Sequence, residues 1–567
     1  MRMAKVGLLF DQREAEKKWA DGENVFEVYL FEVFDHLRIP YEKIGNEAPF
    51  HSYDLIIEVF CRDQGVITEK LLSYLQSGGT LISYGGLNGL KESLGLTAGG
   101  TMDKGYARLS DLLSGELPPL RFLHAQTWEN TAGVSSMASK GTLSSTKDAP
   151  EQSTLSAFQR IEYGAGKIER WSISVPGTIA GIQQGTGPVE KDGVPAPDGT
   201  ANLDENLLKA DDGFELDWVM DRSITETGMP YFDLPYADLW KKAIVEHILA
   251  CAAEKGLTLP FVDFWPDGIE HIAMISHDSD LNVDESALTT LEVLKSEGVN
   301  STWCMIAPGY SPAIYEKIKS DGHEIALHYN ALEQEDGIWS EDEFISQLEW
   351  LKQTTGTNDI VSNKNHYTIF KGWGELFSWC EKHGIQADQT RGPSKKGNIG
   401  FLFGTCHPYF PVAWADEKNR FYDVVEIGFL TQDLNHHTLA DSSVIQPFLD
   451  GVKNVNGVAH FLFHQYHIYN QPPVREALIE LMKTAKNQGF SFWTSAEINK
   501  WERERRKVSI RGISGEIEFD GQPEQDGLVL LIPIEAEKGT NQLQGDTETV
   551  TRFGFRCRKV KPVSYVL

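Results

Sequence analysis

Paired cysteines are missing from this sequence of 567 residues. Its six cysteines are scattered, and no two have the C-x-x-C spacing that is typical of zinc-binding or redox-active thiols. We therefore predict reduced thiols rather than a disulfide framework, which favours a cytoplasmic protein. The cysteines are Cys61, Cys251, Cys304, Cys380, Cys406 and Cys557.

Basic residues and long apolar runs are also scarce. The chain has 52 Lys and Arg against 82 Asp and Glu, a formal net charge of −30. Nucleic acids and anionic membranes bind basic faces, so we expect neither as a partner. No apolar run approaches the length of a membrane span, and the one at the start is too short for a signal peptide. Hydrophobic residues make up 41% of the chain, so it can bury large cores.

Strand-like and helix-like segments alternate over residues 1–100. The segments KVGLLF, YDLIIEVF and TLISYGG are typical of strands, and NVFEVYLFEVFDHLRI and TEKLLSYLQSGG of helices. This order predicts a parallel, doubly wound sheet. Two loop-like insertions, 135–156 and 185–213, flank a predicted hairpin at 158–174, and a helix follows at 236–256.

The alternation restarts near Phe261 and predicts a second α/β domain. Strand-like HIAMIS, NSTWCMI and HEIALH are separated by helix-like ESALTTLEVLKSEG and SPAIYEKIKSDG. Ser340 and Glu343 have the spacing of a capping box at the start of a further helix. Short strand-like segments without helices follow the basic residues 503–507. We therefore predict three domains, 1–262, 263–505 and a small β-rich domain at 506–567.

The segment HIAMISHDSDLN, residues 271–282, places an imidazole and two carboxylates at the end of an apolar strand. Such a strand end lies at the rim of a sheet or barrel, where α/β enzymes carry their chemistry. Asp278 and Asp280 are two residues apart, so both leave an extended strand on the same face. A simple Asx turn is the alternative. A calcium loop fits poorly, because Val283 stands where the EF-hand requires Gly and Thr289 where it requires Glu.

Residues 270–500 resemble the polysaccharide deacetylase (NodB homology) superfamily. The resemblance is carried by LEVLKSEGVNSTWCMI, by IKSDGHEIALH, and by HFLFHQYH near the end of the region. SHDSD stands where the family has an Asp-Asp motif and is similar to a divergent His-Asp-x-Asp branch. The resemblance implies a distorted (β/α) barrel and hydrolysis of an acetyl group with one bound divalent metal ion. Zinc is our first expectation, with Mn, Co, Ni or Fe as alternatives.

The resemblance also implies roles for individual residues. Asp278 takes the place of the general base, and Asp280 and His328 take those of metal ligands. Because Ser279 separates the two Asp residues, their roles can be exchanged. His323 stands at the strand entrance, where the family has no ligand. The second metal histidine of the family falls on Leu332.

A replacement ligand is therefore needed, and His366 in NKNHY is our candidate. Lys364 stands near the place of the family's arginine. His464, at the end of AHFLFH, takes the place of the general acid, with His460 and His467 as alternatives that the pattern does not separate. Four aromatic residues are candidates for the walls of a sugar site, with core packing as the alternative. They are Trp373, Trp379, Tyr409 and Phe410.

Residues 1–260 resemble a class I glutamine amidotransferase-like, flavodoxin-like domain. The turn SYGGLNG stands where the amidotransferases place their nucleophilic Cys, and it contains none. Cys61 follows an earlier strand. We therefore expect this domain to be non-catalytic and to lack glutaminase activity.

Together these observations predict a metal-dependent hydrolase that removes N-acetyl or O-acetyl groups from a sugar or oligosaccharide. Its partner is then an acetylated carbohydrate, and the sequence leaves the oligomeric state open. An inactive carbohydrate-binding scaffold and a hydrolase of a non-sugar C–N bond remain alternatives. A glycosidase needs two carboxylates about 5–9.5 Å apart across a cleft, which neighbours on one strand fit less well.

Overall fold

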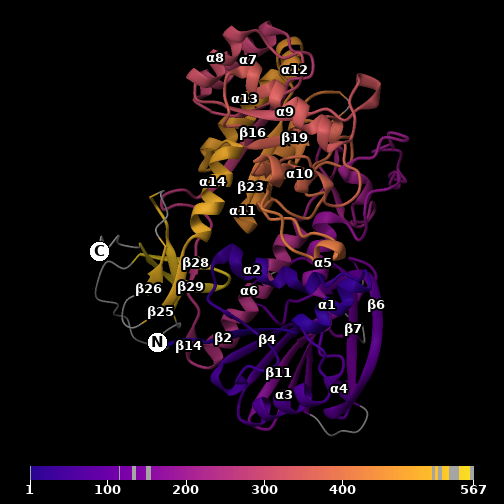
Figure 1. Ribbon diagram of the computed structural model, residues 1–567, viewed down its shortest axis with the longest axis vertical. Helices are drawn as coiled ribbons and strands as arrows, with labels where there is room; N and C mark the ends of the chain where they lie inside the picture. The colour runs from indigo at the N-terminus through magenta and orange to yellow at the C-terminus, as the bar shows by residue number, and fades with distance from the viewer. Residues whose placement is uncertain are drawn as a thin grey trace.

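The computed structural model describes residues 2–561 apart from 114, 116, 131–135, 149–154, 438, 514–516, 522–525 and 535–547. The protein is of mixed α/β type. It has a lower lobe built on a seven-stranded sheet, an upper lobe built on a curled parallel sheet, and β-strands beside the junction of the two (Figure 1). None of the described helices combines the length and the apolar character that a membrane crossing requires.

The lower lobe contains the predicted parallel strands and extends them by a hairpin. Its sheet has the order β3-β2-β4-β5-β11-β10-β8, parallel from β3 to β11 and antiparallel beyond. Neighbouring strand residues such as Leu8 and Leu9 belong to different hydrophobic cores, so both faces of the sheet are buried. The strands are β2 Val6–Phe10, β3 Glu42–Ile44, β4 Leu55–Phe60, β5 Thr80–Tyr84, β8 Ser136–Lys140, β10 Phe158–Tyr163 and β11 Gly166–Trp171.

The lower lobe also has helices and a second sheet, and the strands of that second sheet were not predicted from the sequence. The helices are α1 Gln12–Ala20, α2 Tyr29–Leu37, α3 Val66–Gln76, α4 Leu90–Ser93, α5 Val175–Gln184 and α6 Tyr236–Glu254. A separate sheet joins β7 Leu120–Asn130, β6 Leu96–Arg108 and β9 Thr142–Ser144. The prediction of a loop over 135–156 was therefore wrong where β8 and β9 form; residues 135 and 149–154 lie outside the described part. Strand pairing outweighs the Ser- and Thr-rich composition there. The predicted hairpin is confirmed as β10 and β11.

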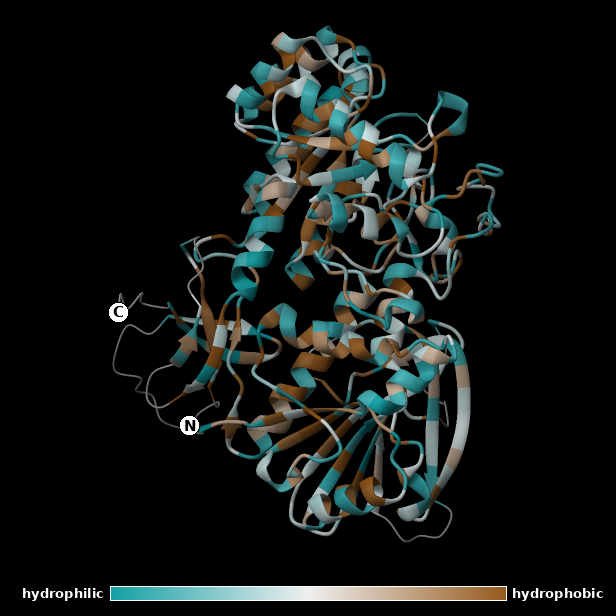
Figure 2. Ribbon diagram, in the orientation of Figure 1, coloured by the Kyte–Doolittle hydropathy of each residue, from teal (hydrophilic) through white to brown (hydrophobic). Residues whose placement is uncertain are grey.

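The upper lobe is a single curled sheet in which every strand pair is parallel. Its order is β21-β20-β19-β18-β17-β16-β23-β22, with β24 also paired to β16. The strands are β16 His271–Asp278, β17 Thr302–Met305, β18 Glu324–Tyr329, β19 Ser362–Asn365, β20 Ala387–Asp388, β21 Val425–Glu426, β22 Thr431–Gln432, β23 Val458–Leu462 and β24 Phe490–Phe492. In Figure 2 apolar colour marks β16 and β23 in the middle of this sheet, whereas β19, with the sequence SNKN, is hydrophilic.

Helices follow most of these strands, as parallel connections require. They are α7 Asp284–Glu297, α8 Pro312–Ser320, α9 Glu341–Thr355, α10 Glu375–His383, α11 Ile445–Val455, α12 Gln465–Asn470, α13 Pro472–Asn487 and α14 Ser495–Arg506. Ser340 caps α9 as expected, because its side chain accepts a hydrogen bond from the Glu343 amide.

The C-terminal strands form two small sheets, one of which includes a strand that precedes the upper sheet in sequence. β25 Ser509–Ile513 pairs with β26 Ile517–Asp520. β27 Leu530–Pro533, β29 Phe555–Val560 and β28 Thr549–Arg552 form a sheet with β15 Phe261–Val262. The domain limits at 262/263 and 505/506 stay predictions, as do the flavodoxin-like and β-rich assignments.

The two lobes are joined by hydrogen bonds over long sequence distances. Oδ1 of Asn419 in the upper lobe accepts from Nε1 of Trp19 and from the amide of Val25, each at 2.7 Å. At the other end of the junction, both terminal nitrogens of Arg506 bond to Glu32 on α2, at 2.6 and 2.8 Å.

Candidate metal centre and active site

The predicted site residues meet at one rim of the upper sheet. β16 is buried from Ile272 to Asp278, and Asp280 lies in the turn that follows. His328 is the last residue but one of β18, and His366 comes directly after β19. Because parallel strands share the edge at which their carboxyl ends lie, three separate stretches of chain bring their polar ends together.

Asp280, His328 and His366 form one compact group. Oδ1 of Asp280 lies 3.3 Å from Nε2 of His328 and 3.4 Å from Nδ1 of His366. The same two imidazole nitrogens are 3.1 Å apart. The geometry makes this group one of two in the described part of the chain that could hold a metal ion.

In both His328 and His366, the ring nitrogen that points away from Asp280 has a partner of its own. These partners determine which ring nitrogen faces Asp280. Nδ1 of His328 lies 2.9 Å from the main-chain oxygen of Lys364, and this carbonyl can only accept. Nε2 of His366 lies 3.2 Å from Oε2 of Glu335. In the neutral rings Nε2 of His328 and Nδ1 of His366 therefore carry free lone pairs toward Asp280. Outer partners of this kind commonly orient metal-binding histidines.

The donor set fits a divalent cation. Oδ1 of Asp280 is buried and has no hydrogen-bond partner. One carboxylate oxygen and two imidazole nitrogens are ligands that zinc and neighbouring transition metals accept. Burial opposes the charge of Asp280, but the His464 imidazolium and the proximity of His328 and His366 lower its pKa well below the ordinary value. Burial disfavours the imidazolium of His366, but the neighbouring carboxylates of Asp280, Glu335 and Asp278 together raise its pKa above the ordinary value.

Asp278 lies beside this group without being part of it. Its Oδ2 is 3.8 Å from Nε2 of His328, and its Oδ1 is 3.6 Å from the ammonium of Lys364. Lys364 is fully buried and also donates to Oγ of Ser276 at 3.0 Å. The lysine thus anchors one oxygen of Asp278 and leaves the other near the centre.

His464 lies on the other side of Asp280. Its Nε2 is 3.3 Å from Oδ2 of Asp280, and its Nδ1 donates to Oδ2 of Asp433 at 2.5 Å. The main-chain amide of His464 donates to Oδ1 of the same Asp433. Burial disfavours the imidazolium, but the charges of Asp433 and Asp280 raise the pKa of His464 well above its ordinary value.

The other histidines of the sequence motifs have different surroundings. His460 is buried and contacts Oγ of Ser276, so this alternative for the acid lies beneath the rim. His277 is buried on the opposite face of β16 with Nδ1 on the main-chain oxygen of Phe463. His323 accepts a hydrogen bond from the Ser301 amide at the entrance of β18. His467 contacts Oδ2 of Asp433 at 3.0 Å and belongs, with His464, to the second group.

Two residues of the site were missed in the sequence. Asp433 follows β22 at an apolar-to-polar transition like those before Asp278 and His328, and this signal could have revealed it. Glu335 lies on an irregular loop with no such signal. Leu332 is buried at the start of the same short turn, Glu333–Glu335.

The four predicted sugar-binding aromatics are not exposed at the rim. Trp373, Tyr409 and Phe410 are buried, and Trp373 stacks on Phe26 of the lower lobe. Trp379 packs against Trp339 and Tyr329. These residues serve core packing, the alternative reading of the sequence.

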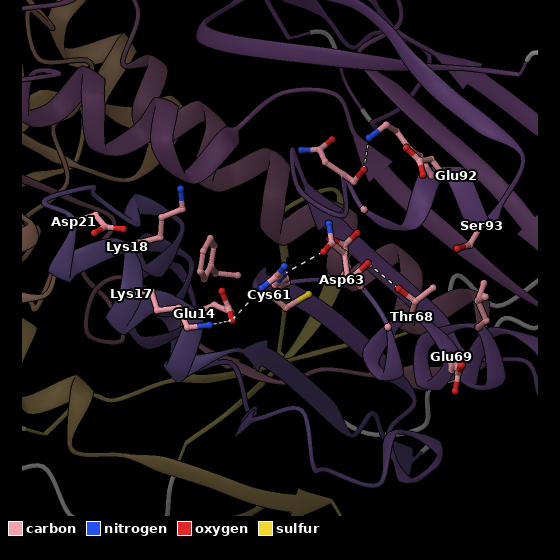
Figure 3. A pocket seen from close by; sticks show the side chains of 18 residues that line it. Glu14, Lys17, Lys18, Asp21, Cys61, Asp63, Thr68, Glu69, Glu92 and Ser93 are labelled. Carbon is pink, nitrogen blue, oxygen red and sulfur yellow. Dashed lines mark hydrogen bonds and ion pairs between the residues drawn. The ribbon is translucent and has the colours of Figure 1, made fainter.

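A large pocket of about 1110 Å³ lies elsewhere, at the carboxyl ends of β4 and β5 in the lower lobe (Figure 3). Cys61 lines it, among the charged side chains of Glu14, Lys17 and Asp63. Burial and the negative charges of nearby carboxylates raise the pKa of the Cys61 thiol well above its ordinary value. A thiol in this state is a poor nucleophile.

No protein-family model and no curated protein matches the chain. Among solved structures, a polysaccharide deacetylase described as putative from Mycobacterium smegmatis is 17% identical with a TM-score of 0.33. The match covers 42% of this chain and 92% of that one. A variant of the peptidoglycan deacetylase PdaC from Bacillus subtilis is 12% identical with a TM-score of 0.26, over 42% and 95% of the chains. The β-galactosidase of Bacillus circulans sp. alkalophilus is 15% identical with a TM-score of 0.25, over 30% and 28%. Similarities this distant carry no argument about activity. Any inference about function therefore rests on the geometry of the site.

Proposed function

We propose that the protein is a metal-dependent hydrolase that removes acetyl groups from an N-acetylated or O-acetylated sugar or oligosaccharide. The observation that carries the proposal is the orphaned Oδ1 of Asp280, which two imidazole lone pairs face. Asp280, His328 and His366 would hold one divalent cation. When bound, such a cation polarises a carbonyl and lowers the pKa of a water molecule.

Asp278 suits the role of general base. Its Oδ2 is on the side of His328, while Lys364 holds Oδ1 by an ion pair. A fixed carboxylate within reach of the centre can accept the proton of an attacking water. The alternative exchange of roles between Asp278 and Asp280 is less favoured, because only Asp280 contacts both His328 and His366.

His464 suits the role of general acid. Asp433 accepts the Nδ1 proton, so the opposite nitrogen, Nε2, is directed at the centre. A proton on Nε2 can then be delivered to the leaving nitrogen or oxygen of the sugar. The pairing of an imidazole with a buried carboxylate fixes both ring orientation and tautomer, as in other acid–base catalysts.

The substitution of the family's second histidine by Leu332 does not favour an inactive scaffold. His366 fills the gap in the ligand set from another strand, and Glu335, three residues after Leu332, supports it. The proximity of both Asp278 and Asp280 to one atom of His328 also favours a single metal site over a pair of glycosidase carboxylates.

The test is metal analysis of protein purified without chelators, followed by acetate release from acetylated oligosaccharides. We expect about one metal ion per chain, lost in Asp280→Asn and His366→Gln. Asp278→Asn should keep the metal but lower turnover by roughly 10²–10⁴. A metal-free wild-type protein, or acetate release that survives the loss of the metal, would contradict the proposal.

A further inference from the structure

A pocket of about 400 Å³ lies where the two lobes and the C-terminal strands meet, and we name it the junction pocket. Its walls come from α2 and α6 of the lower lobe, from the C-terminal end of α11 in the upper lobe and from the turn between β28 and β29 (Figure 1). A pocket of this volume is large enough for a small organic molecule.

The junction pocket is separate from the candidate metal centre. His271, the first residue of β16, lines the pocket, whereas Asp278, the last residue of this strand, lies beside the centre. At a rise of about 3.3 Å per residue, the two ends of such a strand are about 23 Å apart. The pocket therefore lies at the opposite rim of the upper sheet.

Aromatic side chains form one wall of the pocket. The ring of Phe264 lies 5.2 Å from that of His407 and 6.0 Å from that of Phe553. His36 stacks on His407 with the ring centres 5.2 Å apart. Burial lowers the pKa of both His36 and His407, so their rings are neutral at pH 7. An occupant of the pocket would therefore meet a flat and largely apolar wall.

The turn that supplies Phe553 has a strained backbone. The φ of Phe553 is +50°, a value that residues other than glycine seldom adopt. Its ring is buried and lies 5.4 Å from that of Phe261. Strain of this kind persists where the surroundings impose it, and it is common beside ligands. The turn thus presses an aromatic ring into the junction at the expense of a relaxed backbone.

Basic side chains gather at the pocket, although acidic residues outnumber basic ones by 82 to 52 in the whole chain. Four cationic side chains and one carboxylate, that of Asp238, are among the lining residues. The cations are Lys241, Lys242, Lys453 and Arg552. A concave site with an excess of one charge attracts ligands of the opposite charge.

Three of the four cations already have a carboxylate partner. The pairs are Lys241 with Asp238 at 3.1 Å, Lys453 with Asp450 at 2.6 Å and Arg552 with Asp263 at 2.9 Å. Lys242 is partly buried and has no ion pair in the described part of the chain. The pocket therefore has a surplus of one positive charge.

Asp238 does not cancel this surplus, because its oxygens are already occupied. Oδ1 accepts hydrogen bonds from Lys241 and from the hydroxyl of Thr405. Oδ2 accepts from the main-chain amides of Cys406 and His407. A buried carboxylate with four donors is structural, and its charge is balanced by its own partners.

His271 offers a neutral donor beside the cations. Its Nδ1 is buried and has no hydrogen-bond partner. Burial, together with the charges of Lys453 and Arg552, lowers the pKa of His271. A neutral imidazole carries one N–H, which can donate to an anion. A buried polar atom without a partner costs free energy that a ligand can recover.

We propose that the junction pocket binds an organic monoanion, namely a carboxylate with an aromatic or other flat apolar body. The body would pack on Phe264 and Phe553, and the carboxylate would pair with Lys242 and His271. A surplus of one charge matches a carboxylate better than a phosphate group, which carries a charge of about −1.5 to −2 at pH 7. The inference makes no use of the metal centre and goes beyond the proposed function.

The probe is 2-naphthoate, titrated into the full-length protein by calorimetry at pH 7. The neutral alcohol 2-naphthalenemethanol and inorganic phosphate each carry one half of the proposed chemistry. We expect 2-naphthoate to bind at about one site per chain, as ligand pockets are few in a protein. The alcohol should bind at least about tenfold more weakly, because it lacks the charge-assisted hydrogen bonds. Phosphate should not displace the naphthoate.

Lys242→Gln is the decisive variant, because it removes the surplus charge from a side chain that has no ion pair to break. We expect the Kd for 2-naphthoate to rise about tenfold or more, with an unchanged melting temperature of the free protein. His271→Phe keeps a ring and removes the donor, so it should also raise the Kd. Lys500→Gln is the matched control, because Lys500 is an exposed lysine on α14 and does not line the pocket.

A second readout is the melting temperature in the presence of the probe. A ligand that binds the folded chain stabilises it, so 2-naphthoate should raise the melting temperature of the wild type and of Lys500→Gln more than that of Lys242→Gln. Equal shifts in all three proteins would overturn the proposal.

The remaining outcomes are equally distinct. Equal affinity for the acid and the alcohol would show an apolar pocket without charge selectivity, and displacement by millimolar phosphate would show a site for inorganic anions. Either result, or no binding of 2-naphthoate by the wild type at millimolar concentration, overturns the proposal. None of these measurements uses acetate release, so this inference and the proposed function can fail separately.

Discussion

Nε2 of His366 lies 3.2 Å from Oε2 of Glu335, so a carboxylate on one loop orients an imidazole on another. The sequence places these residues on either side of α9. The influence of Glu335 on the centre passes through His366.

Replacing Glu335 by Gln should therefore weaken metal binding without removing a ligand. Loss of such an outer partner typically lowers metal affinity by about 10–100-fold. Competition with a chelator of known affinity measures the effect. Glu333→Gln, a change of the same kind on the same turn, should leave the affinity unchanged. Equal losses in both variants would show that the loop, rather than the His366 contact, matters.

Asp433→Asn should lower turnover while the metal stays bound. The Asn side chain can present an amide N–H to Nδ1 of His464, which favours the tautomer with its proton on Nε2 and disfavours the imidazolium. We expect a loss of roughly 10²–10⁴ in kcat, and His464→Ala, which removes the proposed acid itself, should lower kcat by as much. Asp441→Asn, on the same loop, is the matched control. Metal loss in Asp433→Asn would instead favour a ligand role for the second group.

The stability of the upper lobe should fall as the pH drops below neutrality, in part through His323. Burial lowers the pKa of His323 from 6.5 to about 4. Below pH 6.5 the unfolded chain therefore gains a proton on this imidazole that the folded chain takes up only near pH 4, so acid favours unfolding. At pH 5 this amounts to roughly 2 kcal/mol, since each pH unit is worth about 1.4 kcal/mol.

His323→Gln removes this proton linkage and keeps an acceptor for the Ser301 amide. Urea unfolding of both proteins at pH 8 and pH 5, followed by tryptophan fluorescence, provides the measurement. We expect the difference between the two pH values to be smaller in the variant by about 2 kcal/mol. An unchanged difference would show that His323 is protonated in the folded chain as readily as in the unfolded one.

Cys61 should be unreactive in the native protein. Its raised pKa keeps it as a thiol, and thiols alkylate far more slowly than thiolates. We expect iodoacetamide at pH 8 to modify it slowly until urea is added, and we expect no release of ammonia from glutamine. Rapid native alkylation, or ammonia release that disappears in Cys61→Ser, would contradict this.

The centre could be predicted in large part because its residues follow local patterns. Asp278 and His328 lie at the ends of short apolar runs, and the carboxyl ends of parallel strands meet by necessity. His366 was identified because it too follows an apolar-to-polar change, at IVSN. The position at which the resemblance places a histidine holds Leu332 instead. Its closeness to Asp280 and His328 is what the structure adds; its role as a ligand stays a proposal.

Other parts depend on contacts that no local pattern encodes. Trp373 and Tyr409 are buried, whereas Tyr367 is exposed, and nothing in the local sequence distinguishes them. The packing of the lower lobe on the upper one decides which of these aromatic side chains are buried. The long strands β6 and β7 were missed because Gly- and Thr-rich LTAGGTMDKGYAR has weak apolar alternation and is stabilised by its partner. Glu335 reaches His366 only through the path of an irregular loop.

The segment 186–233 has a consequence for how far the protein can be divided into independent parts. These residues belong in sequence to the first 262, yet some of their main-chain hydrogen bonds are made to Phe370 and Gly372, just beyond His366. A fragment that starts at residue 263 would retain Asp280, His328 and His366 but would lose the hydrogen bonds that hold the chain just beyond His366. The candidate centre and the predicted domain limits therefore do not coincide. A fusion protein that carries the upper sheet would also have to carry residues 186–233.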